Sequence, residues 1–591
     1  MAKYRTLLSR GYFPKELPPH FYSEPFAKYA TTHNGRAMLA SYKPDNMTTQ
    51  SVAYTLAQPG SNGRELRIPH PFAFAKLAAL VIKNLKPLLK IAGSSQIARS
   101  RPVFDLHFRR SFRPLIKLQN LVVERAAIRA GGLFVLKADV SQFYPSLYTH
   151  AVAWAVTPST RKKENWNKKK LLGNAIDQAL RICNGGQSQG VPIGTDISFL
   201  LTECVLARVD PALGFQKNRA CRWFDDYEIS FESREEVEAG LRKLQGQLAD
   251  FNLRLNPTKT KITELPETNQ PLWQQRLHET ARASFRRAQD MITHFDVAFA
   301  MRCEFPGAPI LLYAMGILFK INQPTAEVGR IAESCITQAL LGEPGSAQKA
   351  FALLSFWSIN GFKLNTDLIA KTISRMIFRH QWKGASSDIA WALAFCLQEK
   401  ISLSNEAADV LSQFDDDCIL LQALDLRSSG LLPHGFKIDR VKTRLKDAHL
   451  DREHWLLAYE TVRHGFLTTT NRLVQKNNLF ADFLAKKISF YRRKVPRYSL
   501  VLHPGGAPDW VVRAWLKALL KGSQGNLEKP VPGQDSGALR LVANDVAELA
   551  KRLTDLGSVD EALARLLDVR MIEAGESPEV PEELPEYPNP F

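Results

Sequence analysis

The stretch CRWFDDYEISF places two adjacent aspartates, Asp225 and Asp226, between two runs of strand-forming residues. Aromatic and β-branched runs separated by only two residues predict a β-hairpin with a tight turn. Neighbouring carboxylates repel each other, so a chain tolerates them here only where something neutralises their charge. The alternative is an ordinary polar turn, because Asp is common in turns.

A third acid, Asp139, ends the predicted strand LFVLKAD. If that strand lies beside the hairpin, the three carboxylates converge. Such a cluster needs cations, and the hard cation Mg²⁺ prefers oxygen ligands. Two Mg²⁺ ions about 3.5–4 Å apart can activate a hydroxyl and stabilise a leaving pyrophosphate. We therefore expect Asp139, Asp225 and Asp226 to be catalytic residues that bind two Mg²⁺ ions.

The chain contains its own comparison for the acid pair. The run of Asp415, Asp416 and Asp417 is equally acidic, but it lies between two predicted helices. Acids are favoured at helix N-termini, so we expect this run to cap the helix that follows. The FDDY segment differs because strands flank it and a strand-end aspartate precedes it.

Four further residues suit the handling of a nucleotide. Tyr144 follows Asp139 closely and could exclude a 2′-hydroxyl, which would select dNTPs. The Gly-rich loop GGQSQGVPIGTD offers Gln189 as a hydrogen-bonding group and Gly190 for close backbone approach. Lys259 in LNPTKTKI could protonate a departing pyrophosphate. The alternatives are a core aromatic, a plain loop and a solvated lysine.

Composition narrows the class of protein. The chain has 591 residues and a formal net charge of +19, which suggests DNA or RNA as a partner. Its seven cysteines are scattered singly, as in a reducing compartment. The first residues show no apolar leader, and we find no run of about 18 apolar residues. We therefore expect a cytoplasmic protein that does not interact with membranes.

The hydrophobic patterns divide the chain into four parts. Residues 1–60 are rich in aromatics and proline and predict an irregular arm with short helices. Residues 61–270 mix helical and strand patterns and predict an α+β unit. Residues 275–570 show helix after helix, which suggests stacked pairs of HEAT-like character. Residues 571–591 are rich in Glu and Pro and predict a disordered acidic tail.

Taken together, these residues resemble the fingers and palm of a reverse transcriptase over about residues 60–270. ADVSQFYPSLYTH is similar to motif A of that family, SQGVPIGTD to motif B, RWFDDY to motif C and LNPTKTKI to motif D. The resemblance implies an α+β reverse transcriptase domain followed by an all-α domain. It also implies that Asp139 and Asp225 bind metal, that Tyr144 is the steric gate and that Gln189 contacts the incoming nucleotide.

The stretches RGYFPKELPPHFYSEPFA and RELRIPHPF, with the helical half, are similar to bacterial abortive-infection and other defence-associated reverse transcriptases. That resemblance implies a role in antiphage defence and a homo-oligomer formed through the helical domain. It also implies that synthesis can be primed by a tyrosine and can be untemplated. Phe224 departs from the small residue that many relatives carry before the acids, which puts the fit of a primer in doubt.

A tyrosine primer has to be mobile or borne on a loop to reach Asp139. Each candidate also has an ordinary structural explanation. The candidate primers are Tyr22, Tyr29, Tyr42, Tyr491 and Tyr498.

Basic clusters offer contacts for phosphates, although each could equally be a solvated surface. HFRRSFRP lies in the part that resembles the fingers, and we expect its arginines to bind triphosphate or template. In RKKENWNKKK, a tryptophan available for stacking accompanies the cations. The candidate residues are Arg109 and Arg110 for the nucleotide, and Lys162, Lys163, Trp166, Lys168, Arg492 and Arg493 for nucleic acid.

Three functions remain open from the sequence. The first is an RNA- or protein-primed DNA polymerase of the reverse transcriptase type in antiphage defence. The second is a retron-like templated enzyme with a dedicated RNA. The third is a defence protein that kept the polymerase shape but only binds nucleic acid. The intact acid cluster argues against the third, because clustered carboxylates without metals are costly.

Overall fold

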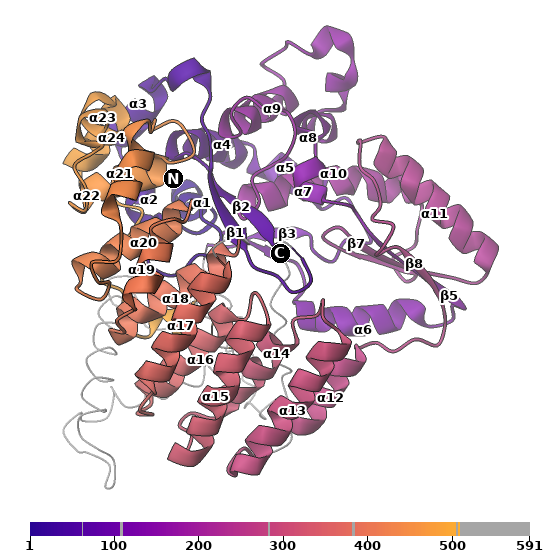
Figure 1. Cartoon of the computed structure of the whole chain (residues 1–591). Coiled ribbons are helices and arrows are strands. Elements are labelled where there is room, and N and C mark those ends of the chain that lie inside the picture. Colours follow the sequence, from indigo (N-terminus) through magenta and orange to yellow (C-terminus); the bar gives the residue numbers. More distant parts are fainter. Residues whose placement is uncertain are drawn as a thin grey trace, which may run out of the picture.

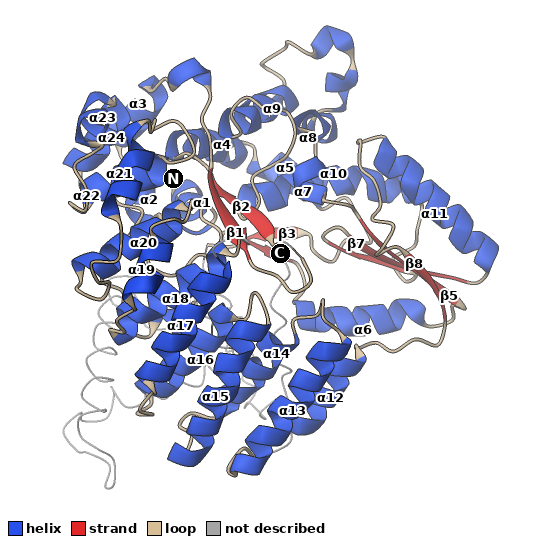
Figure 2. Cartoon of the chain, viewed as in Figure 1, coloured by secondary structure: helices blue, strands red, loops and turns tan. Residues whose placement is uncertain are grey.

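The computed structural model of the chain describes residues 1–503, except 62, 107–109, 282–283 and 381–383, together with residues 506 and 508. An α+β part comes first and an array of helices follows it (Figures 1 and 2). Within the described residues, every strand lies before residue 265. This order agrees with the α+β unit and helical half that the sequence predicts. The predicted tail, residues 571–591, lies outside the described residues.

The elements of the first part are α1 (Ala2–Arg10), α2 (Glu24–Thr31), α3 (His33–Ser41), β1 (Val52–Leu56), β2 (Arg64–Ile68), α4 (Pro71–Lys83), α5 (Leu85–Ala92), β3 (Pro102–Phe104), β4 (Phe112–Pro114), α6 (Leu118–Arg129), β5 (Phe134–Asp139), α7 (Phe143–Ser146), α8 (Thr149–Val156), α9 (Leu172–Cys183), α10 (Asp196–Leu213), β6 (Ala220–Trp223), β7 (Asp226–Phe231), α11 (Arg234–Ala249) and β8 (Lys261–Glu264).

The elements of the second part are α12 (Leu272–Ala281), α13 (Ala288–Glu304), α14 (Ile310–Ile317), α15 (Ala326–Gly342), α16 (Ala347–Ile359), α17 (Thr366–His380), α18 (Ser386–Glu399), α19 (Asn405–Leu411), α20 (Asp417–Ser428), α21 (Ile438–Lys446), α22 (Trp455–Arg463), α23 (Asn471–Lys476), α24 (Asn478–Ala485) and α25 (Ser499–Leu502).

A four-stranded antiparallel sheet in the order β6-β7-β5-β8 forms the base of the first part. Helix α11 packs on β5 and β7, whereas α6 packs on β6 and β7. Figure 1 shows these two helices on opposite sides of the sheet. Strand β5 is central, and its register places Asp139 opposite Asp226. The sheet therefore brings together two acids that are far apart in the sequence.

The stretch FAFAKLAALVIKNLKPLLKI, residues 72–91, has a helical apolar period and forms two helices, α4 and α5, with a break at Asn84. Pro87 has no N–H to donate to the carbonyl of Lys83, and its ring crowds that carbonyl. The apolar periodicity continues through the break because both helices bury one face in the same core.

The helices of the second part stack in two rows. Helix α13 packs on α15, α15 on α17 and α17 on α19. In the other row α14 packs on α16, and the series continues through α18 and α20 to α22. Each helix thus contacts the next but one, as expected for stacked pairs. The assignment to HEAT-like repeats stays a prediction.

None of the described helices is long and apolar enough to cross a membrane.

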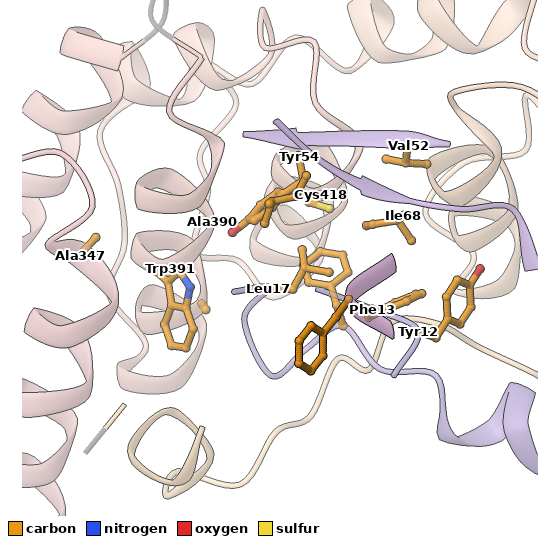
Figure 3. Packing of buried hydrophobic residues seen from close by; sticks show 14 of the residues in the cluster. Tyr12, Phe13, Leu17, Val52, Tyr54, Ile68, Ala347, Ala390, Trp391 and Cys418 are labelled. Carbon is orange, nitrogen blue, oxygen red and sulfur yellow. The ribbon is translucent and has the colours of Figure 1, made fainter. Parts of the chain in front are cut away.

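The N-terminal segment packs between the two parts. Tyr12 and Leu17 are buried, and Figure 3 shows them gathered with side chains of β1, β2 and α18. The indole nitrogen of Trp391 donates a hydrogen bond to the carbonyl of Glu16 over 2.8 Å. Phe21 forms a β-bridge with Tyr491. The buried residues form one continuous cluster across both parts, so we expect them to unfold together.

The acidic run at residues 415–417 caps a helix, as the sequence predicts. Asp416 is the N-cap of α20, and its carboxylate accepts a hydrogen bond from the backbone N–H of Ile419. The carboxylate of Asp417 accepts the backbone N–H of Leu457 at 3.0 Å. Asp416 and Asp417 therefore serve helix capping and packing in this part of the chain, whereas Asp415 before them is exposed.

Buried Glu343 predicts a pH-dependent stability. Its two carboxylate oxygens accept the backbone N–H groups of Leu311 and Leu312, each at 2.9 Å. Burial raises the pKa of Glu343 from its usual 4.5 to about 7. Between these values the folded chain holds a proton that the unfolded chain has lost, so the free energy of unfolding falls as the pH rises through this window.

The Glu343→Gln variant carries no titratable group at this position. We expect its free energy of unfolding to fall less steeply than that of the parent between about pH 5 and about pH 8, and the two changes to differ by on the order of 2–3 kcal/mol. Thermal unfolding followed by calorimetry measures this slope. Exposed Glu327 on α15 is the control, since its replacement by glutamine leaves the slope unchanged. Parallel pH profiles for the parent and Glu343→Gln would contradict the assignment.

Candidate active site

The β6–β7 hairpin turns one residue earlier than the sequence suggests. The turn residues are Phe224 and Asp225, while Asp226 is the first residue of β7 and pairs with both Trp223 and Asp139. Phe224 takes a left-handed conformation with φ of 53°. Two-residue hairpins favour such backbone angles because they match the twist of the strands. Pairing on both sides therefore makes Asp226 part of the sheet.

Buried Arg222 holds this turn in place. Its Nη1 donates to the carbonyl of Phe224 over 2.6 Å, and its Nη2 lies 3.0 Å from Glu203 and 2.8 Å from Asp210. From the other side, the hydroxyl of Ser100 accepts the N–H of Phe224 at 2.8 Å. The position of the acid pair thus depends on a buried charged network behind the turn.

The three predicted acids lie together at the end of β5. Asp139 and Asp225 are buried, and the N–H of Val140 donates to the carbonyl of Asp225 over 3.3 Å. Burial, with the charges of Asp226 and Asp139, raises the pKa of Asp225 to about 7. Burial and the charge of Asp139 raise the pKa of Asp226 to about 6. Desolvation and mutual repulsion, which the adjacent acids in the sequence predict, are the causes.

Lys259 neutralises part of this charge. Its Nζ lies 3.1 Å from Oδ1 of Asp139, although 62% of the lysine side chain is exposed. Its segment is tied to the acids, because the N–H of Asn256 donates to the carbonyl of Asp139 at 2.7 Å. One predicted nucleotide-binding residue therefore contacts one predicted metal ligand.

The oxygen atoms that the site offers suit a divalent cation. Oδ1 of Asp225 is buried and has no hydrogen-bond partner. All three acids offer carboxylate oxygens, the ligands that Mg²⁺ prefers. Among the described residues, however, no three acidic, histidine or cysteine side chains are arranged to hold a metal ion as they stand. An ion would have to draw the carboxylates closer together.

One cleft of about 770 Å³ contains most of the predicted site. The predicted residues that line it are Asp139, Tyr144, Gln189, Gly190, Asp225, Asp226 and Lys259. The Gly-rich loop is fastened beside the acids, since the N–H of Val191 donates to the carbonyl of Tyr144. The hydroxyl of Tyr144 lies 3.4 Å from Oγ1 of Thr202, and burial raises its pKa. The fold thus brings four separate segments to one cavity.

Several residues of this cleft were not predicted from the sequence. Arg64 and Arg67 from β2 line it, as do Asn184 and Asn256. The charge of Arg64 lowers the pKa of Asp225, which opposes the larger effect of burial. The basic strand RELRI was a usable signal, because cations beside a triphosphate site bind phosphate oxygens. Nothing in the local sequence, however, showed that β2 faces the acids.

Neither of the two arginines predicted to bind the nucleotide is among the described residues that line the cleft. Arg109 lies outside the described residues. The guanidinium of Arg110 donates to Asp196, to the carbonyl of Phe13 at 2.6 Å and to that of Gly194 at 3.1 Å. These contacts fasten the N-terminal segment to α10. Contact of Arg110 with a triphosphate would require breaking them, and it stays a prediction.

The predicted nucleic-acid contacts lie outside the cleft lining. Lys162, Lys163 and Lys168 are exposed on the connection between α8 and α9, together with Trp166. Arg492 and Arg493 lie elsewhere, at the contact between the N-terminal segment and the helical part. Nε of Arg492 donates to the carbonyl of Pro19, and Nε of Arg493 donates to Asp425. The two basic segments therefore do not form one surface around the acids.

The five candidate primers have structural contacts in this conformation. The hydroxyls of Tyr29, Tyr42 and Tyr491 donate to the carboxylates of Asp482, Asp451 and Asp425. Tyr22 is half-buried beneath Arg492, and Tyr498 is buried. The described lining of the cleft includes none of the five. A priming role would require a rearrangement and stays a prediction.

Comparison with known protein families finds a match in the first part of the chain. The family described as "Reverse transcriptase (RNA-dependent DNA polymerase)" matches residues 64–286. No curated protein matches the sequence. Among solved structures, apo telomerase from Candida tropicalis is similar, with a TM-score of 0.29, 10% identity and coverage of 63% of this chain and 70% of that one.

Telomerase from Candida albicans, in complex with a fragment of telomeric RNA, is similar with a TM-score of 0.25 and 11% identity. The match covers 63% of this chain and 69% of that one. The family match includes β2, the acids of β5 and β7, the Gly-rich loop and Lys259, which are the segments that form the cleft. This chain therefore carries a reverse transcriptase domain, with its cleft between β2 and the four-stranded sheet.

Proposed function

We propose that the chain is a DNA-synthesising nucleotidyltransferase that uses dNTPs and two Mg²⁺ ions. The observation that carries the proposal is the convergence of Asp139, Asp225 and Asp226 with Tyr144 and Gln189 in one cleft. Bound Mg²⁺ would supply charge neutralisation for the acids and for the phosphates of the nucleotide. The unpartnered oxygen of Asp225 supports a cation as the missing partner.

The side chains of the cleft suit distinct tasks. The ring of Tyr144 bounds the space for the sugar, and Gln189 offers an amide for the base or sugar edge. Lys259 is exposed at its end yet reaches Asp139, so its ammonium can turn to the phosphates and donate a proton to the leaving pyrophosphate. Arg64 and Arg67 offer guanidinium groups to the same phosphates.

The biological role in this proposal is antiphage defence by abortive infection. Support comes from the motifs at the N-terminus and from a helical half in the place of a thumb. We further propose a homo-oligomer through the helical part, and priming by RNA or by a protein tyrosine. A templated, retron-like reaction with a dedicated RNA is the other form of the same chemistry.

A single preparation tests this function. The purified full chain is incubated with labelled dNTPs in Mg²⁺ or in EDTA, digested with nuclease and weighed by mass spectrometry. Metal-dependent incorporation is expected, and a nucleotide mass left on a tyrosine peptide would identify a protein primer. A defined RNA–DNA hybrid would indicate the templated form. Absence of incorporation with any primer or metal would overturn the proposal.

A nucleic-acid-binding protein without catalysis is the second candidate. The salt bridge of Lys259 with Asp139, and the lack of a preformed ligand set among the described side chains, favour it. The +19 net charge would serve such a protein equally well. Salt-sensitive binding of nucleic acid without incorporation would support this candidate over the first.

Tyr144 predicts the choice of sugar. Replacing it with alanine opens space beside the sugar, so we expect the preference for dNTPs over rNTPs to fall by about 10–100-fold, the range that a steric pocket supplies. Steady-state incorporation of matched dNTPs and rNTPs measures this ratio. Tyr144→Phe keeps the ring and is the control. Equal selectivity of the parent and Tyr144→Ala would remove Tyr144 as the gate.

A further inference from the structure

A second cavity, of about 550 Å³, adjoins the catalytic cleft. The two share Gln142 and Gln189 as lining residues, so they are neighbours across those side chains. Most of the remaining wall of the second cavity is polar and includes Ser141, Ser146 and Arg254. No role in the nucleotidyl transfer described above accounts for this cavity.

An aromatic ring and a cation of the wall suit a ligand. Tyr148 lies on the same wall and is 37% exposed. The guanidinium-bearing Arg254 is exposed as well. An aromatic face and a cation thus stand together at the rim of a polar cavity.

The basic connection between α8 and α9, residues 157–171, is attached beside this cavity. Arg161 donates to the carbonyl of Asp250 at 3.2 Å, and its guanidinium lies over the rings of Phe251 and Trp154 at 4.8 and 5.0 Å. Asp250 and Phe251 lie between Ala249 and Asn252, which both line the cavity. The connection and the cavity therefore share one turn of the chain.

The connection has a defined shape. The side-chain amide of Asn174 donates to the carbonyls of Asn165, Trp166 and Lys168, at 2.7, 3.3 and 3.1 Å. The amide of Asn165 is buried and donates to the carbonyl of Ser159 at 2.8 Å. Two asparagines thus hold these carbonyls inward, and residues 166–170 between them are exposed.

The outward side chains are cationic and aromatic. Lys162, Lys163, Lys168, Lys169 and Lys170 are exposed, and within the described part of the chain none of them forms a salt bridge. Trp166 is 60% exposed. Three aromatic residues are prominently exposed among the described residues, namely Tyr148, Trp166 and Phe378. Two of those three lie along this cavity and its adjoining connection.

We propose that the cavity and the α8–α9 connection form a binding track for single-stranded nucleic acid that leads away from the catalytic cleft. Exposed aromatic rings stack with unpaired bases, whereas the bases of a duplex are already stacked on each other. The lysines and Arg254 neutralise the phosphates between stacked bases. The position of the track as an entry or exit path rests on the proposed function, but binding to it does not.

Binding is measured with the full chain in EDTA, so that nucleotidyl transfer is absent and its failure cannot affect the result. The probes are labelled oligodeoxythymidine and oligouridine of about 20 nucleotides, with a duplex of the same length as competitor. Fluorescence anisotropy over a range of salt concentrations gives the dissociation constant and its salt dependence. The DNA and RNA probes distinguish a product strand from a template strand.

We expect Trp166→Ala to weaken binding about tenfold, the loss of one base-stacking contact. Lys168→Gln, Lys169→Gln and Lys170→Gln together should reduce the salt slope by about 2, since each phosphate contact to a single strand contributes about 0.7. These side chains are exposed, so the melting temperature of each variant should match that of the parent.

Helix α17 offers matched controls. Lys371, Arg375 and Arg379 are exposed there and match the lysine triple in number, and Phe378 matches Trp166 as an exposed aromatic. Their replacement by glutamine and alanine should leave binding within about twofold, because this helix is not part of the track. Equal losses in the control variants, unchanged binding in the track variants, or preference for the duplex would each overturn the proposal.

Discussion

Replacing Asp225 and Asp226 together with alanine is expected to reduce dNTP incorporation by at least about 10³-fold, because metal-assisted charge stabilisation is worth several kcal/mol. The double variant removes two of the three carboxylates of the cleft and leaves Asp139 paired with Lys259. Incorporation of labelled dNTPs in Mg²⁺ measures the effect. The fold should persist, since the variant removes carboxylates that burial and mutual repulsion destabilise.

The other acidic run supplies the control for this experiment. Asp415 precedes the capping residue of α20 and is 71% exposed, so Asp415→Ala removes an acid from an equally acidic segment at little structural cost. We expect its incorporation to equal that of the parent. Incorporation that persists in the Asp225 and Asp226 double variant would remove the polymerase function and leave the binding protein as the explanation.

Replacing Arg222 with alanine is expected to destabilise the protein by about 3–5 kcal/mol, the cost of leaving buried charges without a partner. Arg222 is fully buried, and Glu203 and Asp210 beside it are also buried. Its loss also removes the hydrogen bond to the carbonyl of Phe224 that shapes the turn before Asp225. Chemical denaturation followed by circular dichroism measures the change in the free energy of unfolding.

Arg219 is the matched control for this prediction. It lies just before β6 and pairs with Glu232 at the surface, where its side chain is 42% exposed. Exposed ion pairs contribute about 0–1 kcal/mol, so Arg219→Ala should have little effect.

The Arg222→Lys variant separates stability from positioning. A lysine keeps the charge but cannot reach both carboxylates and the Phe224 carbonyl with one planar group. We expect it to fold and to lose incorporation with the affinity for dNTP changed less than the turnover. Wild-type turnover in Arg222→Lys would show that the turn holds its shape without the guanidinium.

Structural features that follow from the local sequence pattern, such as strands and helix caps, were predictable. The runs of strand-forming residues in LFVLKAD and YEISF predict strands, and the acids at their ends meet because β5 and β7 pair with Asp139 opposite Asp226. The cap at Asp416 follows from its place between two helices. The predicted position of the turn was one residue late. Asp226 belongs to the sheet because β7 pairs with β5 in a register that no local sequence pattern specifies.

The burial and the hydrogen-bond partners of residues that contact distant segments were not predictable. The N-terminal segment looked irregular, yet the fold stacks the buried ring of Tyr12 on Phe74 of α4, and Trp391 of α18 donates a hydrogen bond to the carbonyl of Glu16. Arg110 looked like a phosphate-binding residue, but it pairs with Asp196, which lies 86 positions away. Tyr29 and Tyr491 were candidate primers on the sequence alone, and their hydrogen bonds to carboxylates of the helical part could not be foreseen. In each case the partner comes from a segment remote in the sequence.

The sequence by itself determined that this chain carries a reverse transcriptase domain, because the order and spacing of the acids, the Gly-rich loop and the lysine are those of that family. Only the tertiary structure decided which cations and aromatics surround that chemistry. The physical reason is that backbone periodicity is local, whereas burial and ion pairing depend on packing between segments. Arg64 enters the cleft and Arg222 stands behind the turn through that packing alone.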